Sequence, residues 1–169
     1  MAVAAGCSRA PAAADPVWQA AEQPAAAPAT SGAAAVPASL RFSGTTIDGK
    51  PFDASTLAGK PALLWFWAPW CATCASEAQS IGDLAEKYKG KLGILGIAGM
   101  GNNEDMHEFV ADFSLEGVTH LDDEAGRFWK RFKIKEQSLY VVIDRSGKVL
   151  KTGYLDDLQL TTEVKSLVA

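Results

Sequence analysis

The sequence has few cysteines and histidines, the residues that most often bind transition metals, and it has no long apolar stretch. Its 169 residues include only three cysteines and two histidines, and His107 and His120 each stand alone in sequence. A zinc site needs about four ligands, and one Cys-x-x-Cys without a second pair does not supply them. The net charge of −4 argues against a general nucleic-acid binder. No run of about 18 apolar residues occurs, so no transmembrane helix is expected.

The N-terminal part of the chain differs in composition from the rest. Residues 8–39 are mostly Ala, Pro, Ser, Gly and Thr, with only Arg9, Asp15 and Glu22 charged and without sustained periodicity. Such a segment cannot bury enough apolar surface to offset the entropy lost on ordering. The sequence therefore predicts a disordered tether over residues 1–39 and one folded domain over residues 40–169.

Cys7 lies within this tether, apart from the other two cysteines. It follows Val3-Ala4-Ala5-Gly6, and a small residue and a Gly before Cys occur at the end of bacterial lipoprotein signals. The usual Leu is replaced by Ala4, and the charged and hydrophobic signal regions are absent. We interpret Cys7 as a lipidation site, with a stray thiol as the alternative.

The chain is organised around the apolar run from Leu63 to Trp70, which ends in Cys71-Ala72-Thr73-Cys74. A continuous apolar run predicts a strand buried on both faces, and the spacing after Cys74 is helical. At the start of a helix, free N–H groups and the helix dipole favour a thiolate. Cys71 is therefore the expected nucleophile, exposed at the surface, and Cys74 the recessed, resolving cysteine. A purely stabilising disulfide is the weaker reading, because so short a loop gains only about 2 kcal/mol.

The segment around the cysteines runs from Gly59-Lys60-Pro61 through Trp67-Ala68-Pro69-Trp70-Cys71-Ala72-Thr73-Cys74-Ala75-Ser76-Glu77. It resembles the TlpA/ResA/DsbE branch of the thioredoxin-like proteins, and most of all secreted or lipid-anchored actinobacterial members. The likeness covers about residues 40–169. It implies a thioredoxin-like α/β fold with an N-terminal β-hairpin, a central insertion and a mixed β-sheet with helices on both faces.

The pattern along the chain agrees with such a fold. Short strands are expected at 40–42 and 45–47, and the Asp48-Gly49 turn then leads to Lys50-Pro51-Phe52. This part resembles the family's N-terminal hairpin, which is expected to cover one sheet edge. Apolar runs predict further strands at 92–98, 119–121, 139–143 and 149–154. Helical spacing follows Cys74 as far as Tyr88, and recurs over 102–113, 122–132 and 160–168. Alternating strands and helices predict a mixed sheet covered on both faces.

Glu77 and Trp70 are candidates for roles beside the cysteines. Thioredoxins carry a buried Asp six residues before the first cysteine, where this chain has Trp65. Glu77 lies one helical turn after Cys74 and matches the family's Glu, so it is expected to have a raised pKa and to exchange protons with Cys74. A solvated surface Glu is the alternative. Trp70 is expected to shield the thiolate and to offer a flat apolar surface to a substrate peptide.

The loop before the strand at 139–143 departs from the family. Thioredoxin-like proteins have a cis-proline there, and the match by Tyr140 and Asp144 places Gln137 and Ser138 at this position. A cis bond before a non-proline residue costs about 3 kcal/mol, so the Gln137-Ser138 peptide is expected to be trans. The consequence is a reshaped substrate groove formed with Trp70, or, as the alternative, an opening through which a metal reaches the thiols.

Two other clusters are interpreted as structural. Five cations lie near three aromatic residues, but on a helix the two groups take opposite faces, which is typical of a solvated surface helix. The cations are Arg127, Lys130, Arg131, Lys133 and Lys135. The alternative interpretation of these five cations is a preference for acidic substrates. Met106, Phe109, Val110 and Phe113 have the spacing of a buried helix face.

These observations predict an extracytoplasmic thiol:disulfide oxidoreductase, secreted or lipid-anchored at the cell envelope. It would exchange a Cys71-Cys74 disulfide with cysteines of exported proteins, as an oxidant of folding proteins. Reduction of apocytochrome c thiols is the alternative within this class, and copper handling of the Sco kind is the alternative outside it. A peroxiredoxin is excluded, because Ala68 stands where such enzymes need Thr or Ser.

The expected chemistry uses only the Cys71-Cys74 couple, with no further cofactor and no metal. The expected partners are exported proteins with cysteines and a membrane redox partner that resets the disulfide, and nucleic acid is not among them. The protein is expected to act as a monomer.

Overall fold

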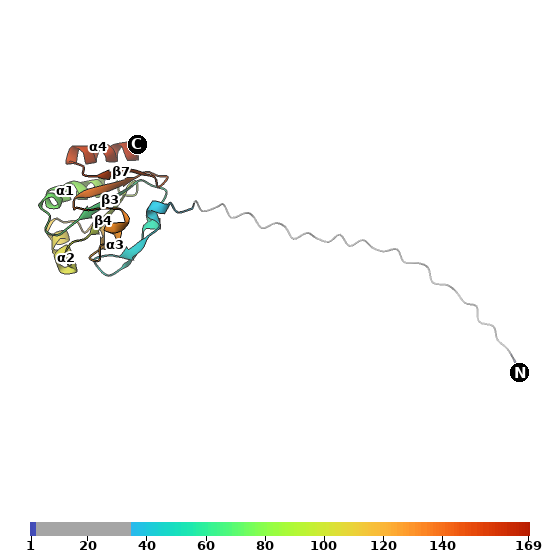
Figure 1. The fold of residues 1–169 in the computed structure, drawn as a ribbon. Helices are drawn as coiled ribbons and strands as arrows, with labels where there is room; N and C mark the ends of the chain where they lie inside the picture. The colour runs from blue at the N-terminus through green and yellow to red at the C-terminus, as the bar shows by residue number, and fades with distance from the viewer. Residues whose placement is uncertain (3–34) are drawn as a thin grey trace. The chain divides into compact units, whose positions relative to one another are not determined.

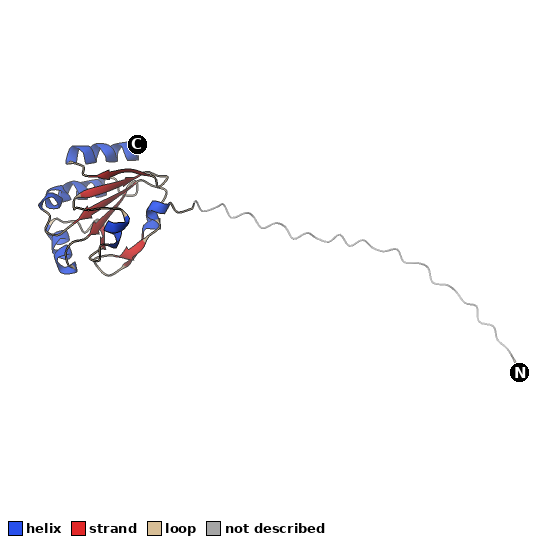
Figure 2. Cartoon of the chain, in the orientation of Figure 1, coloured by secondary structure: helices blue, strands red, loops and turns tan. Residues whose placement is uncertain are grey.

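The computed structural model describes residues 1–2 and 35–169, and Ala34–Ala169 form one compact unit. The centre of this unit is a five-stranded sheet in the order β5-β4-β3-β6-β7 (Figures 1 and 2). Its strands are β3 (Ala62–Trp67), β4 (Gly93–Ala98), β5 (Thr119–Asp122), β6 (Leu139–Ile143) and β7 (Val149–Gly153). The expected strands are confirmed to within a few residues.

The middle strand, β3, contains the apolar run that precedes the cysteines. All six of its residues are buried, because sheet neighbours lie on both sides and helices or loops cover both faces. It pairs in parallel with β4 and antiparallel with β6, so the sheet is mixed as predicted. The register places Trp67 at the end of β3, and the chain therefore delivers the cysteines to the carboxyl edge of the sheet.

Helices cover both faces of the sheet. One core cluster contains apolar residues of α1 (Ala72–Lys87), α2 (Asn103–Asp112) and α4 (Asp157–Val168), packed on alternate β3 residues such as Trp65. The other contains residues of α3 (Arg127–Arg131) and of the 3₁₀ helices η1 (Ala38–Leu40) and η2 (Ala54–Leu57), packed on Leu64 and Phe66. The two-sided arrangement follows from the two-residue alternation along β3.

The N-terminal hairpin forms, but its strands lie at slightly different residues from those predicted. Its strands are β1 (Ser43–Thr45) and β2 (Pro51–Asp53), and residues 38–40 form a 3₁₀ helix in place of a strand. Leu40 is a core residue, which explains why its apolar signal was misread as strand. Thr46 bridges to Leu121 and the Ile47 N–H donates to the His120 carbonyl, so the hairpin covers the β5 edge as expected.

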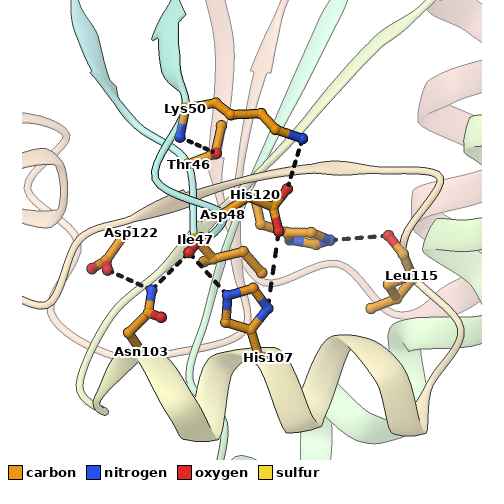
Figure 3. A network of polar contacts seen from close by, with 9 residues as sticks. All are labelled: Thr46, Ile47, Asp48, Lys50, Asn103, His107, Leu115, His120 and Asp122. Carbon is orange, nitrogen blue, oxygen red and sulfur yellow. Dashed lines mark hydrogen bonds and ion pairs between the residues drawn. The ribbon is translucent and has the colours of Figure 1, made fainter.

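A polar network fixes the hairpin turn to α2. The Asn103 side-chain amide donates to the Ile47 carbonyl over 3.0 Å and to Asp122 over 2.9 Å. His107 Nε2 lies 3.0 Å from the same carbonyl and its Nδ1 lies 4.0 Å from Asp48 (Figure 3). The turn therefore has a defined place against α2.

Contact with the domain begins a few residues before the expected boundary at residue 40. Val36 packs against the core, and the Ser39 hydroxyl donates to the Gly147 carbonyl over 2.6 Å. The rest of the expected tether, including Cys7, lies outside the described residues.

The structural interpretation of the two other clusters is confirmed. All five cations between 127 and 135 are exposed, while Phe128 and Trp129 are buried beneath them. The α3 helix is short, and three of its backbone N–H groups, from Arg127 to Trp129, donate to the buried Asp123 carboxylate. Met106, Phe109 and Val110 of α2 are buried in the core.

Candidate functional site

Cys71 and Cys74 form a disulfide at the junction between β3 and α1. Their Cα atoms lie 5.2 Å apart. Cys71 is the N-cap residue of α1, and its Sγ accepts a hydrogen bond of 2.9 Å from the Cys74 N–H. An N-cap sulfur faces unpaired N–H groups and the positive end of the helix dipole, and both stabilise a thiolate after the disulfide is reduced.

The two cysteines differ less in exposure than the sequence predicted. Cys71 is 4 % exposed and Cys74 is fully buried. The order agrees with Cys71 as the attacking and Cys74 as the recessed cysteine, but the expectation of an exposed Cys71 is wrong. Cys71 is mostly covered because its sulfur turns inward to cap α1.

Trp70 is the exposed aromatic residue next to the disulfide. Its side chain is 57 % exposed, whereas Trp65 and Trp67 are fully buried in the core. The indole N–H of Trp70 donates to the Met100 carbonyl over 2.6 Å, and this contact fixes the ring at the surface. Trp70 can therefore offer a flat apolar face beside Cys71.

Glu77 is buried one turn of α1 below the cysteines, with a relative exposure of 3 %. The Tyr140 hydroxyl donates to Glu77 Oε2 over 2.8 Å, and the Ser138 hydroxyl donates to the same oxygen at short range. Burial raises the pKa of the Glu77 carboxyl, and these two donors partly offset that effect. The position agrees with a carboxyl that exchanges protons, and it excludes the solvated surface Glu.

The loop before β6 has an unusual backbone at Ser138. None of the described peptide bonds is cis, so the Gln137-Ser138 peptide is trans as predicted. The Ser138 N–H donates to the Phe66 carbonyl over 2.8 Å, and its φ of 62° lies in the left-handed region. A proline at this position would lack the N–H and could not adopt that φ. The departure from the family sequence therefore accompanies a different loop conformation.

A shallow hollow of about 400 Å³ lies beside the disulfide. Its lining residues are Thr73, Glu136, Gln137, Ser138, Leu139 and Tyr154. Gln137 is half-buried at this surface, which suits a contact with substrate. The Ser138 side chain is 2 % exposed and turns inward to Glu77, so its expected place in a substrate groove with Trp70 is corrected to the inner wall.

Neither histidine has a hydrogen bond to Cys71 or Cys74. His120 is buried, and its Nδ1 accepts from the Trp67 indole N–H over 3.1 Å while Nε2 donates to the Leu115 carbonyl over 3.3 Å. Burial lowers the pKa of His120 to about 4, so the ring is neutral at pH 7. The sequence placed His120 in the core or at the surface but gave no sign of its contact with Trp67.

No group of three or more His, Cys, Asp or Glu side chains among the described residues is arranged to hold a metal ion. Among the helices described, none has the length and apolar character needed to cross a membrane.

Curated relatives resemble part of this chain. Soluble secreted antigen MPT53 of Mycobacterium tuberculosis is 38 % identical over 108 residues, which cover 64 % of this chain and 61 % of that protein. Thiol-disulfide oxidoreductase ResA of Bacillus cereus is 26 % identical over 108 residues, which cover 63 % and 62 % of the two chains. The chain thus matches about three fifths of the length of these curated relatives.

Solved structures give a similar result over a larger share of the chain. The structure of MTB DsbF has a TM-score of 0.73 and 39 % identity, and the match covers 78 % of this chain and 98 % of that one. A secreted Mycobacterium tuberculosis disulfide oxidoreductase homologous to E. coli DsbE has a TM-score of 0.69 and 34 % identity, with 76 % and 98 % coverage. The thioredoxin-like fold and the resemblance to the ResA/DsbE branch are confirmed.

The family model for Redoxin matches residues 23–168, which include every strand and helix of the domain and both cysteines of the disulfide. The chain belongs to the Redoxin family.

Proposed function

We propose that the chain is an extracytoplasmic thiol:disulfide oxidoreductase that exchanges its Cys71-Cys74 disulfide with cysteines of exported proteins. The observation that carries the proposal is the disulfide at the N-terminus of α1, with Cys71 Sγ accepting the Cys74 N–H. Relatives named as a thiol-disulfide oxidoreductase and a disulfide oxidoreductase support the same activity. The reaction needs no cofactor beyond this couple.

The exchange follows from the geometry in two steps. A substrate thiolate attacks Cys71 Sγ, the Cys71-Cys74 bond breaks, and Cys74 leaves as a thiolate that takes a proton from the Glu77 carboxyl. A second substrate thiolate then attacks the substrate sulfur of the mixed disulfide, and Cys71 leaves as a thiolate. The substrate gains a disulfide, and two electrons pass to the protein.

We propose oxidation of substrates as the direction of the reaction. A thiolate stabilised at a helix N-terminus stabilises the reduced form of the couple, which makes the disulfide a stronger oxidant. Cys71 occupies that position. Reduction of apocytochrome c thiols is the alternative, and the potential of the couple decides between the two.

Secreted relatives support a location outside the cytoplasm. MPT53 is described as a soluble secreted antigen, and the disulfide oxidoreductase of 34 % identity is also described as secreted. We propose that the domain works at the cell envelope as a monomer, secreted or anchored through Cys7 on a tether. A membrane redox partner would reset the disulfide after each cycle.

Copper handling of the Sco kind has less support. It requires a histidine that can join two cysteines at the metal, and both ring nitrogens of His120 already have partners in the core. His107 contacts the hairpin turn, far along the chain from the cysteines. We propose no metal at this site.

The test is oxidation of a reduced two-cysteine peptide by the pre-oxidised protein. One peptide disulfide should form for each molecule of wild type, with loss of the Cys71-Cys74 bond. Cys71→Ser should form none, and Ser76→Ala, which changes an exposed residue of the same helix turn, should behave as wild type. A wild type that leaves the peptide reduced would contradict the proposal.

A further inference from the structure

Two hydroxyl groups from β6 and the loop before it converge on one oxygen of a buried carboxyl. The Ser138 and Tyr140 hydroxyls both donate to Glu77 Oε2, the latter over 2.8 Å. Glu77 Oε1 is buried and has no hydrogen-bond partner in the described structure. The same holds for the Trp65 indole nitrogen, although the indole lies near enough to favour the Glu77 anion. Oε2 is therefore held by donors, and Oε1 is the oxygen left to gain or lose a proton.

The backbone conformation at position 138 would suit glycine better than serine, which indicates that the serine hydroxyl has a role there. A φ of 62° favours glycine, and a serine in this conformation carries strain that glycine would avoid. The Ser138 side chain is nevertheless buried and directed at Glu77. A buried hydroxyl kept in a strained conformation, on a carboxyl next to the redox cysteines, points to a functional contact.

Within the part of the chain that the structure describes, no charged group that faces Glu77 stabilises its ionised form, so the carboxylate depends mainly on the Ser138 and Tyr140 hydroxyls. Asp157 of α4 lies near enough to oppose ionisation of Glu77, and Tyr154 and Tyr140 are neutral phenols beside it. Cys74 lies one turn before Glu77 on α1, and Cys71 is the N-cap residue of the same helix. No cation is among the groups that stabilise the Glu77 anion in the described residues 35–169. The two hydroxyl donors are therefore the main groups that oppose the rise in the Glu77 pKa caused by burial.

We propose that Ser138 is a positioning residue that tunes the reduction potential of the Cys71-Cys74 couple: its hydroxyl favours the ionised form of Glu77 and leaves Oε1 free to exchange a proton with Cys74. An ionised Glu77 opposes a thiolate on the neighbouring cysteines, because like charges in a buried site raise each other's pKa. Ser138 thus limits how strongly oxidising the disulfide becomes. The inference rests on the proposed function, since it names a group that regulates the same couple.

The test is a double-mutant cycle with Ser138→Ala and Glu77→Gln, measured by equilibrium with glutathione and by the thiolate absorbance of Cys71 across pH 5–9. Ser138→Ala keeps a Cβ and removes one charge-assisted donor. It should lower the apparent pKa of Cys71 and shift the equilibrium toward oxidation of glutathione by about threefold or more. In the Glu77→Gln background the same change should have no effect, because the ionisable group is gone.

Two further variants distinguish a specific effect on Glu77 from a non-specific effect of substitution on the fold. Tyr140→Phe should shift both readouts in the same direction, and Ser76→Ala, an exposed hydroxyl of α1 bonded to the Thr73 carbonyl, should shift neither. Ser138→Gly relieves the backbone strain and repeats the test if Ser138→Ala folds poorly. An equal effect of Ser138→Ala with and without Glu77 would overturn the inference. A wild type that fails to equilibrate with glutathione would overturn the proposed function, while the Cys71 titration would still test the role of Ser138.

Discussion

The backbone N–H of Cys74 donates a hydrogen bond of 2.9 Å to the sulfur of Cys71. This contact makes the first cysteine of the pair the cap of α1 and places the second inside the helix. Because only the cap sulfur benefits from the helix N-terminus, the two cysteines have different chemistry after reduction. Their roles can therefore be separated by single substitutions.

Cys74→Ser should accumulate a mixed disulfide with substrate, and Cys71→Ser should not. Without Cys74 the bond between Cys71 and substrate has no resolving thiol within the protein, whereas without Cys71 the remaining thiol is fully buried. Non-reducing electrophoresis and mass spectrometry after incubation with a cysteine-containing substrate measure the trapped complex. Trapping by Cys71→Ser alone would reverse the assignment.

Glu77→Gln should remove the part of the pH dependence of the exchange rate that comes from Glu77. Burial raises the pKa of Glu77 above its ordinary value of 4.5, so the wild type changes protonation above that pH and the variant does not. Loss of the proton donor to Cys74 should slow exchange by up to about 100-fold. Stopped-flow rates between pH 4 and 9 measure both effects. An unchanged profile would show that Glu77 takes no part in the proton transfer.

His120→Gln should change how stability depends on pH. The pKa of His120 falls from 6.5 to about 4 on folding, so its contribution is fully present above pH 6.5 and is lost as pH falls toward 4. That loss amounts to about 3 kcal/mol in the wild type. Glu77 and Asp123 have raised pKa values and act in the opposite direction, so the difference between the two proteins isolates His120. Denaturant unfolding at several pH values measures it, and parallel curves would contradict the account.

Deletion of residues 1–35 should leave the domain's melting temperature and exchange activity nearly unchanged. The deletion keeps Val36 and Ser39, which contact the domain. A second deletion, through residue 39, should lower the melting temperature because it removes these contacts. Thermal unfolding followed by circular dichroism measures both proteins. A large loss of stability in the shorter deletion would mean that the N-terminal segment contributes to the fold.

Strong local patterns in the sequence predicted most of the fold. The run from Leu63 to Trp67 favoured a strand buried on both faces, and the spacing after Cys74 favoured an amphipathic helix. The strand predicted at 40–42 was wrong because Leu40 is apolar for a packing reason that depends on distant residues. Short elements lack the periodicity that identifies longer ones.

The site was predictable only in part. Motif spacing identified Cys71 and Cys74, and helix geometry placed Glu77 one turn below them. The contacts of Glu77 with Ser138 and Tyr140 span more than 60 residues and depend on the pairing of β3 with β6. The positive φ of Ser138 has no local signal in sequence, and the Trp67-His120 contact depends on the register of β3, β4 and β5.

Equilibration of the Cys71-Cys74 couple with glutathione buffers of known potential tests the central claim most directly. The account predicts an oxidant, with a reduction potential nearer to about −120 mV, the value of DsbA, than to about −270 mV, the value of thioredoxin. The fraction of disulfide at each buffer potential is read by alkylation and mass spectrometry. A potential near that of thioredoxin would contradict an oxidising role and would favour the reduction of apocytochrome c thiols.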